Sequence, residues 1–236
     1  MHFILPEYVY INIMIQIPTP KNAAEALEIQ QAMRERVQVS HDDFAPVSLI
    51  AGIDVGYDIS RNISKAALVL IRAGDLKPVA TVTAEDPTPF PYIPGLLSFR
   101  EAPVIVKALA QLSDRPDMLF IDGQGIAHPR RVGVAAHIGV LTGLPAIGVA
   151  KSVLCGKYEE PGPAKGSHTP LVHKGEIIAT MLRSKEKCKP LVISPGHRVT
   201  METAVQLVEK CLTKYRLPEP TRLADKLSKI GASALL

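Results

Sequence analysis

The sequence holds few cysteines, only three in 236 residues, and no CxxC pair. Cys155, Cys188 and Cys211 are odd in number and far apart, whereas a disulfide framework or a zinc site needs more ligands at closer spacing. Disulfide-stapled scaffolds and structural zinc sites are therefore excluded. Free thiols suit a reducing compartment, and we expect the protein to be cytoplasmic.

The sequence also lacks an uninterrupted apolar run long enough to span a bilayer. Its most apolar segment, residues 1–17, is broken by Pro6, Glu7 and Asn12 and has neither the basic start nor the cleavage site of a signal peptide. We therefore expect no membrane association. We treat residues 1–20 as an N-terminal extension, which either adds a strand or is loosely attached.

No low-complexity tract, repeat or linker divides the rest of the chain. Residues 21–236 have the length of one large domain and, at 47% hydrophobic and 21% charged, the composition of a globular enzyme. The formal charge of +4 is compatible with a polyanionic partner, but most proteins of this charge bind no nucleic acid. Charge alone assigns no function, and a monomer is the default expectation.

Hydrophobic periodicity predicts an α/β domain. Helices are predicted at residues 23–39, 105–112, 132–141, 200–215 and 221–230. Strands are predicted at residues 49–55, 66–71, 79–83, 118–121, 146–149, 171–172, 177–182 and 191–194. The first three strands, joined by Gly and charged residues, form an antiparallel meander. Strands 118–121 and 146–149, with a helix between them, predict a parallel pair with a crossover. The result is a mixed central sheet flanked by helices.

Two aspartates stand near predicted strand ends. Asp54 alternates with Ile53 and Val55 and so points away from their apolar face. Asp122 follows a buried strand at its carboxyl end, where open α/β sheets place ligands. If the two strands are neighbours, the carboxylates meet and suit Mg²⁺. Either aspartate alone is more often a cap or turn residue, because Asp-Gly is a common turn signal.

Two further acids have ambiguous patterns. Glu101 opens a predicted helix in Ser98-Phe99-Arg100-Glu101, which also fits a capping box, the commoner role of such a glutamate. Asp225 lies roughly opposite the apolar positions Leu223 and Leu227 at ~100° per residue, so it faces either a cleft or water.

A proline-framed loop spans residues 90–95, in which Pro91 and Pro94 enclose Tyr92 and Ile93. Rigid apolar wedges of this type part base steps in a duplex, and a pocket behind them can take a flipped base. A packed turn with a half-buried tyrosine is the commoner alternative.

Residues 123–131 combine flexible backbone at Gly123 and Gly125 with His128 and two arginines. Such a loop suits phosphate contacts and a base pocket made of backbone groups. Lys151 follows the next predicted strand and could place a cation beside the same site, although a lone lysine there is more often solvated surface.

The blocks that carry these residues resemble the endonuclease V family. The matching segments, in family order, are AGIDVGYD from Ala51, PYIPGLLSFRE from Pro91, FIDGQGIAHPRRVGVAAHIG from Phe120, IGVAKSVLCG from Ile147, SPGHRV from Ser194 and YRLPEPTRLAD from Tyr215. They run from about residue 21 to near residue 230. The resemblance implies a ribonuclease H-like fold in a single catalytic domain, residues 21–236, and a Mg²⁺-dependent phosphodiesterase that tolerates Mn²⁺.

The resemblance also implies a role for each acid. Asp54 and Asp122 resemble the metal-binding acids, and Glu101 resembles an accompanying catalytic carboxylate of the metal site. Asp225 falls where relatives place a carboxylate or histidine near the metal. Lys151 matches a polar position that orients the attacking water or balances phosphate charge.

The same resemblance makes Tyr92 the strand-separating wedge and His128 a polar active-site residue. The wedge and base pocket would comprise Pro91, Tyr92, Ile93, Gly95, Leu97, Gly123, Gly125 and Ile126. At Gln124 the sequence departs from the histidine of many bacterial relatives, which we interpret as tuning of substrate contacts.

The family cuts DNA at the second phosphodiester bond 3′ to a deaminated base such as deoxyinosine, leaving 3′-hydroxyl and 5′-phosphate ends. The resemblance thus implies a DNA repair endonuclease, with inosine in RNA open as a second substrate. Two rival hypotheses are a sugar-kinase or actin-like ATPase, which needs two lobes and a longer chain, and a non-catalytic reader of inosine-containing nucleic acid.

Overall fold

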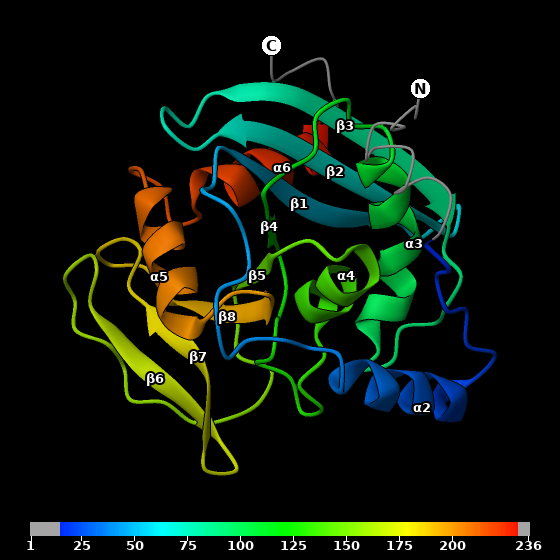
Figure 1. The fold of residues 1–236 in the computed structure, drawn as a ribbon, viewed down its shortest axis with the longest axis horizontal. Coiled ribbons are helices and arrows are strands. Elements are labelled where there is room, and N and C mark those ends of the chain that lie inside the picture. The colour runs from blue at the N-terminus through cyan, green and yellow to red at the C-terminus, as the bar shows by residue number, and fades with distance from the viewer. Residues whose placement is uncertain (1–14, 231–236) are drawn as a thin grey trace, which may run out of the picture.

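The structure is a computed structural model that describes residues 15–230 (Figure 1). Its strands are β1 (Leu49–Asp58), β2 (Ile63–Arg72), β3 (Pro78–Pro87), β4 (Met118–Ile121), β5 (Ala146–Ala150), β6 (His168–His173), β7 (Glu176–Leu182) and β8 (Leu191–His197). Its helices are α2 (Ala23–Arg34), α3 (Leu97–Leu109), α4 (Val134–Thr142), α5 (Met201–Lys210) and α6 (Glu219–Ile230). The described strands form one eight-stranded sheet in the order β3-β2-β1-β4-β5-β8-β7-β6.

The strand pairing confirms the predicted topology. Strands β1, β2 and β3 form the antiparallel meander, and β4 and β5 continue the sheet parallel to β1. Beyond β5, the strands β8, β7 and β6 pair antiparallel. This is the mixed, helix-flanked sheet of a ribonuclease H-like fold. Because β1 and β4 are direct neighbours, the aspartates near their ends come together.

The central strands of the sheet are buried on both faces, which explains why they are apolar. On one face, α3 and α4 pack over Ala51 and Ile53 of β1. On the other, α5 and α6 pack over Ile50 of β1 and Phe120 of β4. Side chains of alternating β1 positions thus enter two different cores, as the period of two in a strand requires. None of the helices within residues 15–230 is long and apolar enough to cross a membrane.

Several predicted boundaries were wrong by a few residues. The helix predicted to reach residue 39 ends at Arg34, and the helix predicted to reach residue 215 ends at Lys210. Strand β1 extends to Asp58, beyond the predicted end at residue 55, because it continues to pair with β2. Apolar residues after a helix continue its spacing when they pack as loops, and periodicity cannot separate the two cases.

The predicted N-terminal extension lies only partly within the described residues. Residues 15–20 form neither helix nor strand, but Ile15 and Ile17 pack against the core that α3 and α4 cover. Residues 1–14 lie outside the described range.

Helix α6 approaches β1 unusually closely. A Cβ atom added to Gly52 would overlap the backbone carbonyl of Pro220 in the first turn of α6. Only glycine permits this backbone-to-backbone contact. It holds α6 against the strand that carries Asp54, and so places the side chains of α6 beside the end of β1.

Candidate active site

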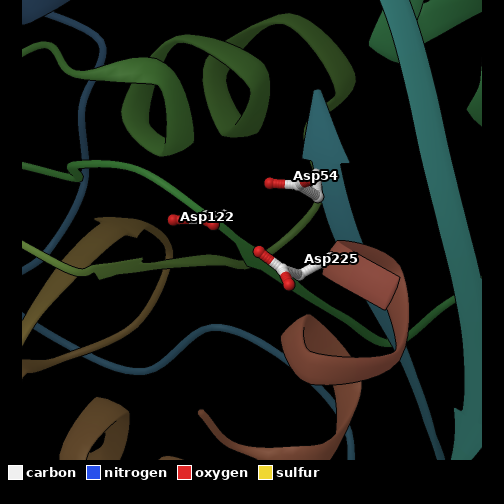
Figure 2. A group of neighbouring side chains, drawn as sticks. All are labelled: Asp54, Asp122 and Asp225. Carbon is white, nitrogen blue, oxygen red and sulfur yellow. The ribbon is translucent and has the colours of Figure 1, made fainter. Parts of the chain in front are cut away.

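Three carboxylates meet at the ends of β1 and β4. Asp54 lies on β1, Asp122 directly follows β4, and Asp225 lies on α6; one oxygen of each lies within 4.8 Å of the others (Figure 2). The register explains the first pair, since Ile53 is opposite Ile121 and the Asp122 amide donates to the Ile53 carbonyl at 2.9 Å. We call these three residues the carboxylate triad. Asp225 faces the cleft, which resolves the choice that its helical position had left open.

Lys151 joins two members of the triad. Its Nζ lies 2.5 Å from Asp122 Oδ2 and 2.6 Å from Asp225 Oδ1. Burial alone would lower the pKa of Lys151, but its hydrogen bonds to the two carboxylates raise it above its ordinary value. The lysine therefore stays charged and offsets the repulsion between the acids. Lys229 adds a second cation, with Nζ 2.7 Å from Asp225 Oδ2.

The acids retain an excess of negative charge that a cation would neutralise. Burial raises the pKa of Asp122 to about 6, and the nearby Asp54 carboxylate adds to this effect against the opposing effect of Lys151. Ser228 Oγ donates a hydrogen bond of 2.5 Å to Asp54 Oδ2 and so fixes the orientation of this carboxylate. Clustered carboxylate oxygens are ligands that hard divalent cations prefer, so the donor set fits Mg²⁺ or Mn²⁺.

Glu101 lies beside the triad but is not one of the three clustered acids. It is buried, and the hydroxyl of Tyr57 donates to its Oε1 at 2.7 Å. Burial raises the pKa of Glu101 to about 8; the Tyr57 hydrogen bond lowers it, while the charges of Asp54 and Asp122 raise it further. The structure places Glu101 on the α3 side of β1, close enough to sense two members of the triad.

The capping alternative for Glu101 is wrong. Helix α3 begins at Leu97, and the residue before it, Leu96, makes no side-chain cap hydrogen bond. Ser98, the expected cap, instead shares a hydrogen bond of 2.8 Å with His137 Nδ1. Helix α3 starts two residues earlier than the motif implied, so Glu101 lies a full turn inside the helix.

A pocket of about 350 Å³ opens beside the triad. Asp122 and Lys151 form one part of its wall, and the proline-framed loop and the first turn of α3 form another. Its lining residues are Tyr92, Pro94, Gly95, Leu97, Ser98, Asp122, Gly123, Gln124, His128, Val132, Gly133, Val134, Ala150, Lys151, Ser152, Val153 and Leu154. We call it the base pocket, and the proline-framed loop of residues 90–95 the wedge loop, after the roles that the sequence predicts for them.

Of the eight residues predicted for the wedge and the base pocket together, four line this pocket and four do not. Tyr92, Gly95, Leu97 and Gly123 are part of the wall. The remaining four lie outside it: Pro91 is exposed, Ile93 packs in the cluster around Phe90 and Phe99, Gly125 donates from its amide to Ser194 Oγ, and Ile126 donates to the Pro195 carbonyl.

Tyr92 stands out from the protein surface. Its side chain is 67% exposed at the mouth of the base pocket. The alternative of a half-buried tyrosine in a packed turn is therefore wrong. An aromatic ring held in solvent on a rigid loop is free to contact another molecule.

Hydrogen bonds from three side chains hold the wedge loop in place at Gly95. The Gly95 carbonyl accepts hydrogen bonds from Gln30 Nε2 at 3.1 Å, His128 Nε2 at 3.0 Å and Arg130 Nη2 at 2.7 Å. Arg130 also donates from Nε to the Gln30 side-chain oxygen, which closes the network. Gly95 has a φ of +79°, and a Cβ there would press on the Arg130 guanidinium.

His128 acts within this network as a neutral donor. The Arg130 amide donates to His128 Nδ1 at 3.1 Å, so we assign the ring proton to Nε2, which donates to Gly95. Burial lowers the pKa of His128 to about 4, and Arg130 contributes to this. The structure thus engages both ring nitrogens in holding the loop.

Sequence reasoning missed Gln30. It looks like one of several polar residues on an amphipathic helix, yet its side chain is fully buried, and its Nε2 also donates to the Val132 carbonyl at 2.9 Å. Gln124, the unusual residue of the loop, lines the pocket and donates from Nε2 to the Ser152 carbonyl at 2.8 Å.

Known proteins share this architecture. A family model described as Endonuclease V matches residues 31–226. The chain is similar to an Endonuclease V of Azotobacter vinelandii, with 53% identity over 205 residues that cover 87% of this chain and 92% of that protein.

Solved structures agree. The crystal structure of the Endonuclease V from Streptomyces avermitilis is similar, with a TM-score of 0.85 and 41% identity, covering 92% of this chain and 96% of that one. The Ciona intestinalis Endonuclease V, solved in complex with a 24mer DNA containing an inosine followed by a ribo-adenosine, has a TM-score of 0.76 and 29% identity, covering 87% of this chain and 95% of that one.

Proposed function

Because this chain belongs to the endonuclease V family, we propose that it recognises deoxyinosine and related deaminated bases in DNA and hydrolyses the second phosphodiester bond 3′ to the lesion. The products are 3′-hydroxyl and 5′-phosphate ends, and the cellular role is DNA repair. The inosine-containing DNA bound to the Ciona relative supports the substrate class. The observation that carries the proposal is that Asp122, a member of the carboxylate triad, and Lys151, which is ion-paired with it, both line the base pocket.

Recognition begins at the wedge loop. Tyr92 enters the base stack, and the network around Gly95 keeps the loop rigid while it does so. Hypoxanthine pairs weakly with its partner, so it is extruded at lower cost than a normal base, and this favours the damaged nucleotide. The flipped base enters the base pocket, where the backbone of Gly123 and the side chain of Leu97 are part of the wall.

Hydrolysis takes place at the triad. Asp54, Asp122 and Asp225 would hold Mg²⁺, with Mn²⁺ as a substitute, and Glu101 adds a carboxylate at its edge. The bound cation would supply positive charge at the scissile phosphate and lower the pKa of a bound water. Lys151 remains protonated and balances the charge of the phosphate. Water attacks in line, and no covalent enzyme intermediate is required.

The two rival functions predict different structures or results. A sugar-kinase or actin-like ATPase needs a second lobe, whereas the described strands of this chain form one sheet. A non-catalytic reader of inosine would have no need for three carboxylates around a charged lysine.

The proposal is tested with end-labelled duplexes that carry one deoxyinosine, together with matched inosine RNA, in Mg²⁺ and in EDTA. We expect a single metal-dependent nick one nucleotide beyond the lesion on its 3′ side, and none in a duplex with deoxyadenosine at that position. The ratio of DNA to RNA cleavage assigns the preferred polymer. The Asp54→Asn and Asp122→Asn proteins should bind but not cut. Full cleavage by either variant in Mg²⁺, or binding without a nick by the unmodified protein, would overturn the proposal.

A further inference from the structure

The carboxylate triad borders two hollows. Asp122 belongs to the base pocket, whereas Asp54 and Asp225 line a second, more open cleft of about 720 Å³. Lys151 lines both. The three acids therefore stand at the junction of the two hollows, with space for a ligand on either side.

Two elements form the second cleft. One is the β1–β2 hairpin, which contributes residues 55–60 and Lys65, and the other is the end of α6, which contributes Ser228 and Lys229. We call it the downstream cleft. None of the residues expected from the sequence to bind the base lines it.

The position of the cut relative to the lesion indicates which part of the substrate binds in the downstream cleft. The inference rests on the proposed function: the lesion base fills the base pocket, and the bond that is cut lies on its 3′ side. A strand that leaves the base pocket and passes the triad therefore continues 3′ into the downstream cleft. We propose that the downstream cleft is the binding site for the nucleotides 3′ of the cut, with Ile59 as its principal apolar contact.

Ile59 has an apolar side chain that lies in solvent instead of in the core. At the turn between β1 and β2, its side chain is 88% exposed, the highest fraction among the large exposed hydrophobic residues within the described range. The turn is nevertheless held in place, since Asp58 Oδ1 accepts from Ser60 Oγ at 2.7 Å and from the Arg61 amide at 3.2 Å. An apolar side chain on a fixed turn offers a surface for a base or a sugar, and such contacts are insensitive to sequence.

The cleft wall carries as many lysines as carboxylates, so it has no net negative charge to repel a phosphate backbone. Lys65, Lys151 and Lys229 offset the carboxylates of Asp54, Asp58 and Asp225 along its wall. Lys65 Nζ lies 3.8 Å from Asp58 Oδ2 and 3.1 Å from Glu85 Oε1, so the hairpin presents it at a defined position. Lysines placed along a groove that also holds an apolar contact are the usual features of a site for single-stranded nucleic acid.

The test asks whether the effect of replacing Ile59 depends on the presence of the strand 3′ of the cut. Two deoxyinosine substrates share the same 5′ arm and the same long complementary strand. In one, the lesion strand continues well beyond the cut, and in the other it ends at the first nucleotide after the cut. The proteins are the unmodified enzyme, Ile59→Ser, and the matched control Ile177→Ser, whose residue is 58% exposed on β7 and lines neither hollow.

We expect Ile59→Ser to lower kcat/KM about fivefold on the long substrate, as expected for loss of a partly buried isoleucine contact, mainly through KM. On the shortened substrate its difference from the unmodified enzyme should vanish, and Ile177→Ser should match the unmodified enzyme on both. All three proteins are measured on the same two substrates. Any effect of shortening on the duplex itself therefore cancels in the ratio of kcat/KM between a variant and the unmodified enzyme.

An Ile59→Ser defect of equal size on both substrates, or no defect on either, would overturn the assignment of the downstream cleft. The proposed function would still stand in that case, as long as the unmodified enzyme cleaves the long substrate. Failure of the unmodified enzyme to nick the long substrate would overturn both. Equal melting temperatures for the three proteins exclude misfolding as the source of a difference.

Discussion

The side-chain nitrogen Nε2 of Gln30 lies 3.1 Å from the carbonyl oxygen of Gly95, although 65 positions separate the two residues. Through this contact, helix α2 supports the loop that carries Tyr92. The wedge is therefore not a free surface loop: three donors converge on one of its carbonyl groups. Rigid support of this kind places a functional side chain more reproducibly than packing of the loop alone.

Replacing Gln30 by alanine should weaken both the fold and strand separation. We expect a loss of about 2 kcal/mol in the free energy of unfolding, because the buried Val132 carbonyl loses its Gln30 donor and Arg130 loses an acceptor. We also expect kcat/KM to fall more on duplex than on single-stranded deoxyinosine substrates. Urea unfolding and parallel kinetics measure the two effects. Gln206→Ala on α5 is the matched control, since within residues 15–230 the Gln206 side chain bonds only the exposed Glu202 of its own helix.

Replacing Tyr92 by alanine should separate function from stability. The side chain is largely exposed, so the melting temperature should change little. Cleavage of duplex substrates should fall about tenfold or more, because unstacking a base step costs a few kcal/mol without the wedge. Single-stranded substrates, whose bases are already unpaired, should be cut almost normally. An equal loss on both substrates would show that Tyr92 contributes to the base pocket instead of parting the strands.

Divalent metal should stabilise the folded protein through the triad. With Mg²⁺ about a hundredfold above its Kd, the free energy of unfolding should rise by about 2 to 3 kcal/mol. Asp54→Asn should remove most of this increment, and Asp114→Asn, at an exposed acid outside the triad, should retain it. Thermal melts in Mg²⁺, Mn²⁺ and EDTA measure the effect. An undiminished increment in Asp54→Asn would place the metal elsewhere.

Glu101 should make the metal-free protein less stable as the pH rises. Its pKa of about 8 in the folded protein lies above the ordinary value of 4.5, so between these pH values the folded state holds a proton that the unfolded state has released. Stability is therefore lost as the pH rises towards 8. Between about pH 6.5 and 8, above the ordinary histidine pKa, the loss from this one buried group should be about 2 kcal/mol.

The comparison that isolates this effect is Glu101→Gln, which cannot ionise and should lack that part of the pH dependence. Urea unfolding in EDTA across the same pH range measures both proteins. Parallel curves for the two would show that Glu101 is already ionised in the metal-free protein at pH 6.5. The sign would be opposite for His128, whose lowered pKa of about 4 costs stability only as the pH falls.

The sequence allowed Asp54 and Asp122 to be found, because strand ends and buried apolar runs are local patterns. Their meeting then followed from one topological assumption, that the two strands are neighbours, and the register of Ile53 with Ile121 confirms it. Whether Asp225 faces the cleft or water could not be predicted in the same way. Helical periodicity gives the direction of a side chain relative to its own helix, whereas the cleft it faces is created by docking of α6 on β1.

Gln30 shows more clearly what local sequence patterns cannot predict. A glutamine on an amphipathic helix carries no local sign that it is buried, since its partners are two carbonyls and a guanidinium from distant segments. The capping alternative for Glu101 failed for another reason. Ser98 and Glu101 have the spacing of a capping box, but Ser98 bonds His137 on α4, and this tertiary contact replaced the local one.

The close contact between Gly52 and Pro220 has a consequence for how the enzyme comes into being. Asp54 and its hydrogen-bonding partner Ser228 are 174 positions apart. A nascent chain that has already emerged as far as β5 carries the wedge, the base pocket loop and two of the three acids, but not α6. Under the proposed function, the carboxylate triad stays incomplete until that helix docks on β1, so a growing chain would lack a complete hydrolytic centre.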